Sequence, residues 1–526
     1  MTKPLTRRAF LADAARVAGG AALGGGIVAC WSDRILDPQQ FGRGASSMER
    51  VSAAVNDLLD PPLLAAPSGV LSASIGIGTT PVKIGDRVLL QPVTYADSLP
   101  GPTLWVRQGQ WLDLQFTNRI VFDQAGPRGR YRPPRDAAAT NVHYHGLHVP
   151  PSTTSQGTAD DMSVVIPRNG SQRYFFQIPH THPAGLFFYH PHVHGVLTSQ
   201  MGRGAAGMLY VAGAQDDEVR RRGIRHRLMM LQQAFVDTDD RTLTFDDGAR
   251  EDAAHALSLI NGQLQPDIRI RPGEPQVWSV CNGSTSAFYV LRLDGHEFEV
   301  IANDGLPLPA SSAQNTVAVA PGKRTEFVVR ASNVPGRYAF RLDELNQGVD
   351  SWPAKILGTL VVDGPAWTGQ DHPGVDRSTT FPDLRGLAIA ARRTITFDVN
   401  ENVAEGEYGR FTMNGHPWGT NTAGQPDPEF VEWTSHIGQV EEWVIENHTN
   451  QDHPFHVHTN PIQVVNVTGS PVQAQLGYQD TVVVPRNGGT VTVRTRFDDF
   501  SGRILMHCHI IDHEDMGMMT SFRIAN

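Results

Sequence analysis

Apolar and polar residues alternate along many short stretches of the chain after residue 65. In residues 111–118 (WLDLQFTN) the apolar side chains recur at every second position, which is the period of a half-buried β-strand. The same pattern returns at residues 276–280, 325–329, 441–445 and 490–495. No long amphipathic helical pattern separates these stretches, and 51 glycines and 36 prolines favour short strands joined by turns. The sequence therefore predicts an all-β chain built from antiparallel β-sandwiches.

The length of 526 residues exceeds that of one ordinary domain, and roughly 150 residues per domain indicates three domains. Residues 363–384 are rich in Gly, Pro and Asp, as is typical of a linker. We expect a tether at residues 31–65, followed by domains at residues 66–214, 215–375 and 376–526.

Donor side chains for a soft metal gather in residues 507–519 (HCHIIDHEDMGMM). Cys508 is followed five residues later by His513 and ten residues later by Met518. A thiolate, an imidazole and a weak axial thioether are typical of a type 1, or blue, copper site. His507 and His509 flank the cysteine, and on a strand their side chains point to the face opposite the thiolate. They are therefore predicted to serve a second copper site.

Three further pairs of histidines share the one-residue gap of His507 and His509. They are HYH at residues 143–145, HPH at 190–192 and HVH at 456–458. The motifs HYHG, HPHVHG, HPFHVH and HCHIIDHEDMGMM resemble the four copper signatures of the multicopper oxidases, the family of laccases, ascorbate oxidases and cuprous oxidases. The resemblance covers most of the chain after residue 65. It implies three consecutive cupredoxin-like Greek-key β-sandwich domains that together hold one type 1, one type 2 and two type 3 copper ions.

The resemblance also implies the ligands of each copper. The blue copper would be held by His453, Cys508 and His513, with Met518 as axial ligand in competition with Met516 and Met519. The other coppers would lie between the first and last domains. The type 2 copper would be bound by His143 and His456, and the type 3 pair by His145, His190, His192, His458, His507 and His509. Supporting roles outside the ligand sets are expected for His148, His182 and His194.

Reduction of dioxygen to water also consumes protons, so acids are expected beside the cluster. Glu514 directly follows the ligand His513 and matches the acid placed near the type 3 coppers in relatives. Asp160 or Asp161 is the corresponding candidate near the type 2 copper, and Asp160 is preferred.

The middle and last domains carry an internal repeat. Trp278 and Trp443 are each followed four residues later by an asparagine, Asn282 and Asn447. The histidines of the last domain stand 6, 9 and 11 residues after Asn447. The residues at the same offsets from Asn282 are Phe288, Leu291 and Leu293. The middle domain is therefore predicted to bind no copper.

Residues 1–30 are typical of an export signal. Arg7 and Arg8 form a twin-arginine motif ahead of a Gly/Ala-rich stretch that is too short and too weakly apolar to span a membrane. The stretch ends in IVAC, which resembles a lipoprotein box with Cys30 as the acylated residue. We expect twin-arginine-dependent export to the periplasm and membrane anchoring through Cys30, with simple cleavage into the periplasm as the alternative.

The net charge of −10 argues against a nucleic-acid partner. The three cysteines are Cys30, Cys281 and Cys508, and since two of them have other roles, no disulfide framework is available. Cys281 lies in a strand-like run and is expected to be buried and inert. We expect a monomer.

Two classes of function fit these motifs. An oxidase takes single electrons from a reductant at the blue site and passes them to dioxygen, whereas an electron carrier or copper-binding protein needs only the blue-site ligands. All eight cluster histidines are present, which favours the oxidase. Laccase-like oxidation of a phenol or similar small molecule is predicted. Oxidation of Cu(I) or Fe(II) is the alternative, although the 12 methionines form no Met-rich insertion.

Overall fold

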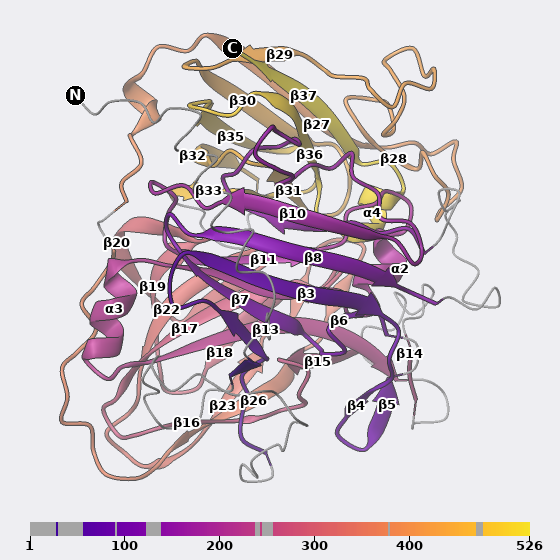
Figure 1. Ribbon diagram of the computed structural model, residues 1–526. Helices are drawn as coiled ribbons and strands as arrows, with labels where there is room; N and C mark the ends of the chain where they lie inside the picture. The colour runs from indigo at the N-terminus through magenta and orange to yellow at the C-terminus, as the bar shows by residue number, and fades with distance from the viewer. Residues whose placement is uncertain are drawn as a thin grey trace, which may run out of the picture.

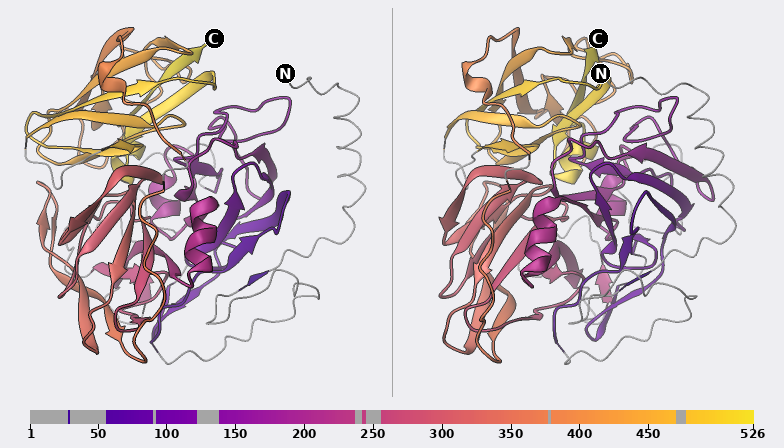
Figure 2. Two further views of the ribbon diagram at one scale, coloured as in Figure 1. Left: turned by 90° about the vertical axis from the view of Figure 1, so that its left-hand side faces the viewer. Right: turned by 60° about the vertical axis from the view of Figure 1, so that its left-hand side comes forward.

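The computed structural model describes residues 28–29, 56–89, 92–121, 138–236, 242–244, 256–376, 379–469 and 477–526. The described residues form three β-sandwiches, visible as three lobes in Figure 2. The helices among them are short: α2 (Leu197–Met201), α3 (Ala214–Arg221), the 3-10 helix η3 (Leu384–Gly386) and α4 (Ile511–Asp515). The all-β prediction is confirmed. The twin-arginine motif and Cys30 lie outside the described residues.

The first sandwich packs a six-stranded sheet against a four-stranded sheet (Figure 1). The six-stranded sheet has the order β1 (Val28–Ala29), β2 (Leu63–Ala65), β7 (Gly101–Arg107), β12 (Gly207–Ala212), β11 (Gly185–His190) and β9 (His143–His145). The other has the order β10 (Ser171–Gln177), β8 (Trp111–Arg119), β3 (Val70–Gly78) and β6 (Thr94–Tyr95). Strand β8 buries every second side chain, so the alternation in the sequence places Leu112, Leu114 and Phe116 in the core.

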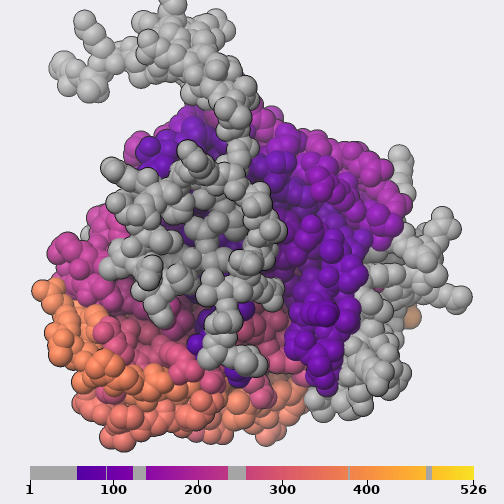
Figure 3. Space-filling view, turned by 60° about the horizontal axis from the view of Figure 1, so that its bottom comes forward, coloured from indigo at the N-terminus to yellow at the C-terminus, as the bar shows by residue number. Residues whose placement is uncertain are grey.

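The middle sandwich has a nine-stranded and a five-stranded sheet. The larger sheet contains β20 (Leu306–Gln314), β19 (Phe298–Asn303), β22 (Arg324–Arg330), β17 (Pro275–Asn282), β13 (Arg225–Val236), β14 (Thr242–Thr244), β5 (Arg87–Leu89) and β4 (Val82–Ile84), with β15 (Ala256–Ile260) beside β13. The smaller contains β16 (Asp267–Ile270), β26 (Lys355–Val362), β23 (Gly336–Leu342), β18 (Tyr289–Leu293) and β21 (Thr316–Val319); β24 (Leu345–Asn346) and β25 (Ser351–Trp352) pair separately. Strands β4 and β5 belong to the first third of the chain, yet β5 pairs with β14 of the middle domain. The first two domains therefore share a sheet, and the two domains lie side by side in Figure 3.

The last sandwich packs a six-stranded sheet against a five-stranded sheet. The first is β28 (Phe411–Met413), β27 (Ala391–Val399), β30 (Val440–Asn447), β35 (Gly489–Arg496), β32 (Ile462–Thr468) and β33 (Tyr478–Gln479). The second is β29 (Thr434–His436), β37 (Met519–Ala525), β36 (Gly502–Cys508), β31 (His453–Val457) and β34 (Thr481–Val484). The neighbouring strands β31 and β36 carry four predicted ligands: His453, His456, His507 and Cys508. Two more, His458 and His509, directly follow the ends of these strands.

The predicted tether of residues 31–65 is too long. Leu58 donates its backbone N–H to the carbonyl of Asp267 in the middle domain, and β2 pairs with β7 in the first domain. Leu58 and Leu64 are both buried. Residues 56–65 therefore belong to the folded body, because two leucines anchor them to it.

The repeat extends to all three domains. The side-chain amides of Asn118, Asn282 and Asn447 each donate to two backbone carbonyls. Each asparagine also accepts, through its Oδ1 atom, the backbone N–H of the residue two positions further on. A corresponding asparagine thus makes the same kinds of hydrogen bond in each domain, and the repeat predicted from the sequence includes two of the three, Asn282 and Asn447.

The offsets counted from these asparagines are wrong by one residue in the middle domain. Asn447 donates to the carbonyl four residues further on, at Gln451, whereas Asn282 donates to the carbonyl five residues further on, at Ala287. One extra residue therefore lies in the turn after Asn282.

The strand register then fixes the corresponding positions. His456 pairs with Thr481 and His507, and Arg292 pairs with Thr316 and Arg341 in the same arrangement. The residues at the positions of His453, His456 and His458 are therefore Tyr289, Arg292 and Asp294. Leu291 and Leu293 lie in the core of the middle domain instead, and Phe288 packs into the hydrophobic cluster of the last domain.

No helix among the described residues is both long enough and apolar enough to cross a membrane.

Candidate metal centres

Strand β36, strand β31 and helix α4 bring three donor atoms together in the last domain. Sγ of Cys508 lies 3.4 Å from Nδ1 of His453 and 3.9 Å from Nδ1 of His513, and the two nitrogens are 3.2 Å apart. All three side chains are buried. Burial lowers the pKa of His453 to about 3, so its imidazole is neutral and offers a lone pair. A cysteine sulfur and two imidazole nitrogens at these distances fit copper.

Met518 is the best placed of the three methionines for the axial position. It is completely buried and lies in the same hydrophobic cluster as Cys508, whereas Met516 and Met519 are buried outside that cluster. Its backbone joins the other ligands directly: Met518 donates its N–H to the carbonyl of His513 and accepts the N–H of Cys508. The short turn after α4 thus ties the axial candidate to two ligands.

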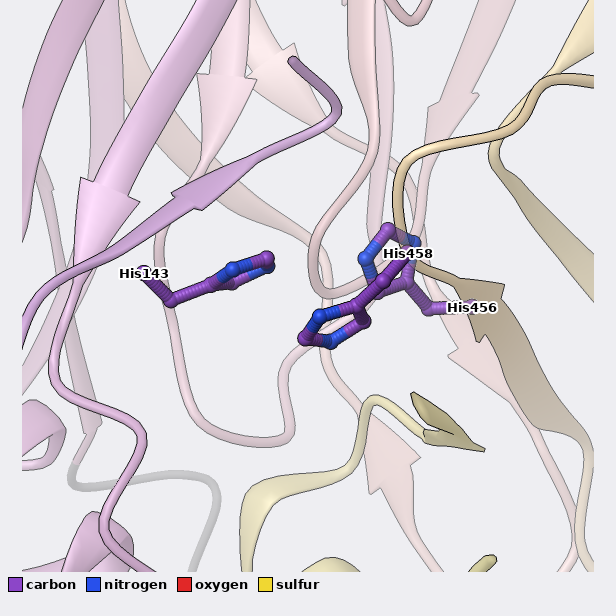
Figure 4. Close-up of side chains that lie close together, drawn as sticks. All are labelled: His143, His456 and His458. Carbon is purple, nitrogen blue, oxygen red and sulfur yellow. The ribbon is translucent and has the colours of Figure 1, made fainter. Parts of the chain in front are cut away.

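The eight paired histidines form one buried group between the first and last domains. Rings of the first domain stack on rings of the last: the centroids of His143 and His458 are 4.0 Å apart, and those of His145 and His456 are 3.7 Å apart. In Figure 4, His143 enters from the first domain and faces His456 and His458 of the last. Nε2 of His507 lies 3.3 Å from Nε2 of His192 and 3.2 Å from Nε2 of His458.

The outer nitrogens of several rings are held by hydrogen bonds, which fixes the direction of the inner ones. Nδ1 of His190 donates to the carbonyl of Pro191, Nδ1 of His456 to that of Asp480, and Nδ1 of His507 to that of Cys508. Metal-binding histidines are commonly oriented in this way.

Several inner nitrogens are buried and have no hydrogen-bond partner among the described residues. They are Nε2 of His143, His190 and His456, Nδ1 of His145 and both nitrogens of His509. Burial lowers the pKa of His143, His145, His190 and His509 well below the usual range, and neighbouring imidazoles lower it further. Buried neutral imidazoles with unused lone pairs call for a bound ligand, so these residues fit a copper cluster.

The groups of close ligand atoms among the described residues all lie in the first and last domains. Three contain cluster histidines alone, one combines His145 and His456 with Asp480, and one is the blue-site set. His143 shares one group with His456 and His458 and another with His145 and His190.

Comparison with known proteins places these sites in a family. Three family models, each described as Multicopper oxidase, match residues 135–216, 229–359 and 396–526. They span more than half of the chain, and the first and last include every predicted copper ligand. The chain belongs to the multicopper oxidase family. It is therefore a copper-binding oxidoreductase that uses dioxygen as acceptor.

Individual relatives agree over most of the chain. "Multicopper oxidase mco" of Staphylococcus haemolyticus is 23% identical over 442 residues, which cover 82% of this chain and 83% of that protein. "Laccase" of Bacillus subtilis is 23% identical over 478 residues, which cover 82% of this chain and 90% of that protein.

Solved structures share the fold. The McoA multicopper oxidase of Aquifex aeolicus has a TM-score of 0.73 at 23% identity, covering 89% of this chain and 99% of that one. A Campylobacter jejuni multicopper oxidase described as a metallo-oxidase has a TM-score of 0.71 at 21% identity, covering 93% and 97%. The three domains are thus cupredoxin-like, as predicted.

Two of the three predicted acids lie at the oxidase's cluster. Oδ1 of Asp160 is 2.9 Å from Nδ1 of His143 and accepts the backbone N–H of Tyr144; burial raises the pKa of Asp160 to about 8. Glu514 is completely buried with its oxygens 3.4 Å from Nε2 of His192 and 2.9 Å from Nδ1 of His507, and burial raises its pKa to about 7.

Asp161 lies elsewhere, although it is adjacent in sequence. Its carboxylate accepts backbone N–H groups from Thr153 and Ser163 on an exposed loop. Because successive side chains point apart here, only Asp160 faces the cluster.

The three histidines expected to have supporting roles lie outside the ligand groups. His148 donates to the carbonyl of Thr459 and pairs with Asp499 of the last domain. Nε2 of His182 accepts the backbone N–H of His148. The ring of His194 contacts those of Tyr408 and Trp418.

Sequence reasoning missed Asp480, which touches the cluster from the last domain. Its Oδ1 atom lies 3.3 Å from Nε2 of His145 and 3.5 Å from Nδ1 of His456. Burial alone would raise its pKa, but the guanidinium of Arg324 holds it well below the usual range. The only signal in the sequence is one acid directly before the strand-like run TVVV at residues 481–484.

Proposed function

We propose that this oxidase is laccase-like. It couples the one-electron oxidation of a phenol or similar small molecule at a type 1 copper to the four-electron reduction of dioxygen to water at a cluster of one type 2 and two type 3 coppers. The observation that carries this proposal is the position of Cys508. Its sulfur lies with His453 and His513, whereas its two neighbours in sequence lie among the cluster histidines: His507 shares a ligand group with His192 and His458, and the ring of His509 contacts that of His145.

Bound copper would supply the one-electron chemistry, which none of these side chains provides by itself. The type 1 ion would be held by His453, Cys508 and His513 with Met518, and the type 2 ion by His143 and His456. The type 3 pair would be held by His145, His190, His192, His458, His507 and His509. Cys508 is joined to two of these histidines by single peptide bonds, so the connection between the sites is short and covalent.

The surface over the blue site favours an aromatic reductant. The ring of Phe411 stacks on His513 with centroids 3.8 Å apart and is itself half-buried. Nearby, Gly409 and Trp418 donate their backbone N–H groups to the carbonyls of Met516 and Gly517. This fixes the segment that carries Tyr408, whose side chain is 41% exposed. A planar reductant can stack on such a surface.

Glu514 and Asp160 would deliver protons to the cluster. Each carboxyl is buried within 3 Å of a ring nitrogen of a cluster histidine, and a general acid must stand within hydrogen-bond reach of the group that it serves. Both groups are shielded from bulk water, which restricts proton movement to these side chains and ordered water.

The N-terminal motif supports export by the twin-arginine pathway and acylation at Cys30. Such a protein would act outside the cytoplasm, anchored to a membrane, as a monomer. Its reductants would then be small molecules of that compartment.

Dioxygen uptake with three reductants tests the substrate class. The copper-loaded protein should give a higher kcat/KM with a substituted phenol than with Cu(I) or Fe(II). Phe411→Ala should raise KM for the phenol and leave KM for Fe(II) within about twofold, because only the phenol uses the ring. A higher kcat/KM with a metal ion, or an equal response of both KM values, would overturn the laccase-like assignment.

A further inference from the structure

The middle domain supplies no predicted copper ligand, yet it places a completely buried cation beside the cluster. Arg324 on β22 has no exposed surface. Its Nη1 atom donates to Oδ1 of Asp480 at 2.8 Å, and Nη2 donates to Oδ2 of the same carboxylate. A planar guanidinium and a carboxylate bonded through both oxygens form a pair of fixed orientation.

The remaining donors of Arg324 are also used, and they reach a third domain. Nε donates to the carbonyl of Leu186 on β11 of the first domain, while Nη1 and Nη2 donate to the carbonyls of Gly322 and Asp304 in the middle domain. A buried arginine with every branch bonded is held in one position. Arg324 therefore ties together all three domains at a single point.

The carboxylate of Asp480, held in place by Arg324, contacts two predicted copper ligands. Oδ1 lies 3.3 Å from Nε2 of His145 and 3.5 Å from Nδ1 of His456, and the backbone carbonyl of Asp480 accepts a hydrogen bond from Nδ1 of His456. The two histidines come from different domains and their rings are stacked. One side chain of the middle domain thus fixes, through Asp480, the position of one histidine from each outer domain.

A second cation fixes the backbone on which Asp480 stands. Nζ of the buried Lys323 donates to the side chain of Gln479 and to the carbonyl of Thr481. It also lies 3.3 Å from Asp304, whose Oδ2 atom accepts the backbone N–H groups of Asp480 and Thr481. Residues 479–481 are therefore held from both sides by the middle domain.

The ion pair of Arg324 and Asp480 lies close to the backbone of Gly146. It directly follows His145 and has a φ of +82°, and a Cβ atom there would collide with Nη2 of Arg324 and Oδ2 of Asp480. A glycine at this position lets the ion pair lie directly against the ligand motif.

We propose that Arg324 is a positioning residue for the copper cluster: through its pair with Asp480, the middle domain orients His145 and His456 for metal binding. The domain would thus contribute to the cluster without contributing a ligand. This inference rests on the proposed cluster of the preceding section.

Copper retention in Arg324→Gln tests the proposal, with Arg330→Gln as the matched control. Arg330 lies on the same strand, but its guanidinium is exposed and pairs with Glu299 and Asp371 at the surface. The loss of a residue that orients a ligand lowers metal affinity by about 10- to 100-fold. Titration of the loaded protein with a chelator should therefore remove cluster copper from Arg324→Gln at least about tenfold more readily. The blue absorption of Arg324→Gln should be unchanged, and so should the copper retention of Arg330→Gln.

Spectroscopy separates positioning from a purely structural role. The electron paramagnetic resonance signal of the non-blue copper should change in Arg324→Gln and be partly restored in Arg324→Lys, which keeps the charge. An unchanged signal and unchanged copper retention, whether or not the unfolding midpoint falls, would overturn the proposal. If Arg324→Gln does not fold, the neutral pair Arg324→Gln with Asp480→Asn takes its place, with the same expected loss. Absence of cluster copper from the unaltered protein would contradict the proposed function instead.

Discussion

Oε2 of Glu514 lies 2.9 Å from Nδ1 of His507, and both side chains are completely buried. Nδ1 of His507 is directed at the carbonyl of Cys508, so neither oxygen of Glu514 accepts a hydrogen bond from any described residue. The carboxyl thus stands at the cluster without a structural task, which suits a group that holds and releases a proton.

Replacing Glu514 by glutamine should slow reoxidation of the reduced enzyme by dioxygen by about 10²-fold or more, the usual contribution of a positioned acid. Reduction by the phenol should remain near normal, because the blue site is unaltered. Stopped-flow traces of the two half-reactions measure both effects. Asp160→Asn should also slow reoxidation, whereas Asp161→Asn, on the exposed loop, is the matched control. Equal reoxidation in Glu514→Gln and the unaltered enzyme would remove the assigned role.

The Cys508→Ser variant should lose the blue site and keep the copper cluster. The thiolate is the source of the intense absorption of a type 1 copper, and no cluster ligand is changed by the substitution. Metal analysis should show the loss of about one copper per chain, with the non-blue signal retained. A variant that stays blue would contradict the ligand assignment.

Much of this site could be predicted from residue type and spacing. A cysteine between two histidines and three more His-x-His pairs carry their chemistry in the local sequence, and the alternation of strand β8 is equally local. The fully buried β11 has no such alternation, so its hydrophobic pattern does not distinguish strand from helix.

The residues that could not be predicted act across domains. Asp480 and Arg324 are 156 residues apart, and a single acid or arginine on a strand has no characteristic spacing. Their importance appears only when the fold buries both. The one-residue error in the repeat had a different cause: the turn after Asn282 is longer by one residue than the turn after Asn447, and a constant offset cannot represent it.

The interface between the first and last domains should weaken as pH rises through the pKa of His148. Burial lowers the pKa of this histidine, but the hydrogen bond to Asp499 and the carbonyl of Thr459 raise it to a net value above the ordinary one. Since the folded pKa is above the unfolded value of about 6.5, the stabilisation is complete below that pH. It is lost as pH rises through the folded pKa.

The expected size is about 1 kcal/mol, because the side chain of His148 is 22% exposed and such pairs are screened by solvent. Charged groups that face it are Asp498, Asp499 and His182. Unfolding midpoints of His148→Gln should fall below those of the unaltered protein at pH 5.5 and converge with them at pH 8.5. The exposed His436→Gln should show no such difference. A constant gap at both pH values would argue against the charged form.

Anchoring depends on Cys30 if the lipoprotein box is used. The unaltered exported protein should fractionate with membranes, and Cys30→Ala should appear in the soluble periplasmic fraction. A single acyl chain binds membranes only marginally, so stable anchoring requires the several chains of a bacterial lipoprotein. A soluble unaltered protein would show that the box is not modified.

The corrected repeat can be tested with two pairs of histidine substitutions in the middle domain. Leu291 and Leu293 are buried in its core, so replacing both by histidine should destabilise the protein by several kcal/mol, on the order of two polar substitutions in a core.

Arg292 and Asp294 stand at the positions of His456 and His458, but they form partly exposed pairs with Asp343 and Arg341. Changing those two to histidine should lower the free energy of unfolding far less than the leucine pair does, because solvent screens such exposed pairs. Neither pair should add a copper, because the facing strand β23 offers Arg341 where β36 has His507, and a metal site needs its full ligand set. Metal analysis and denaturant unfolding measure the two effects; greater destabilisation by the Arg292 and Asp294 pair would contradict the core position of the two leucines.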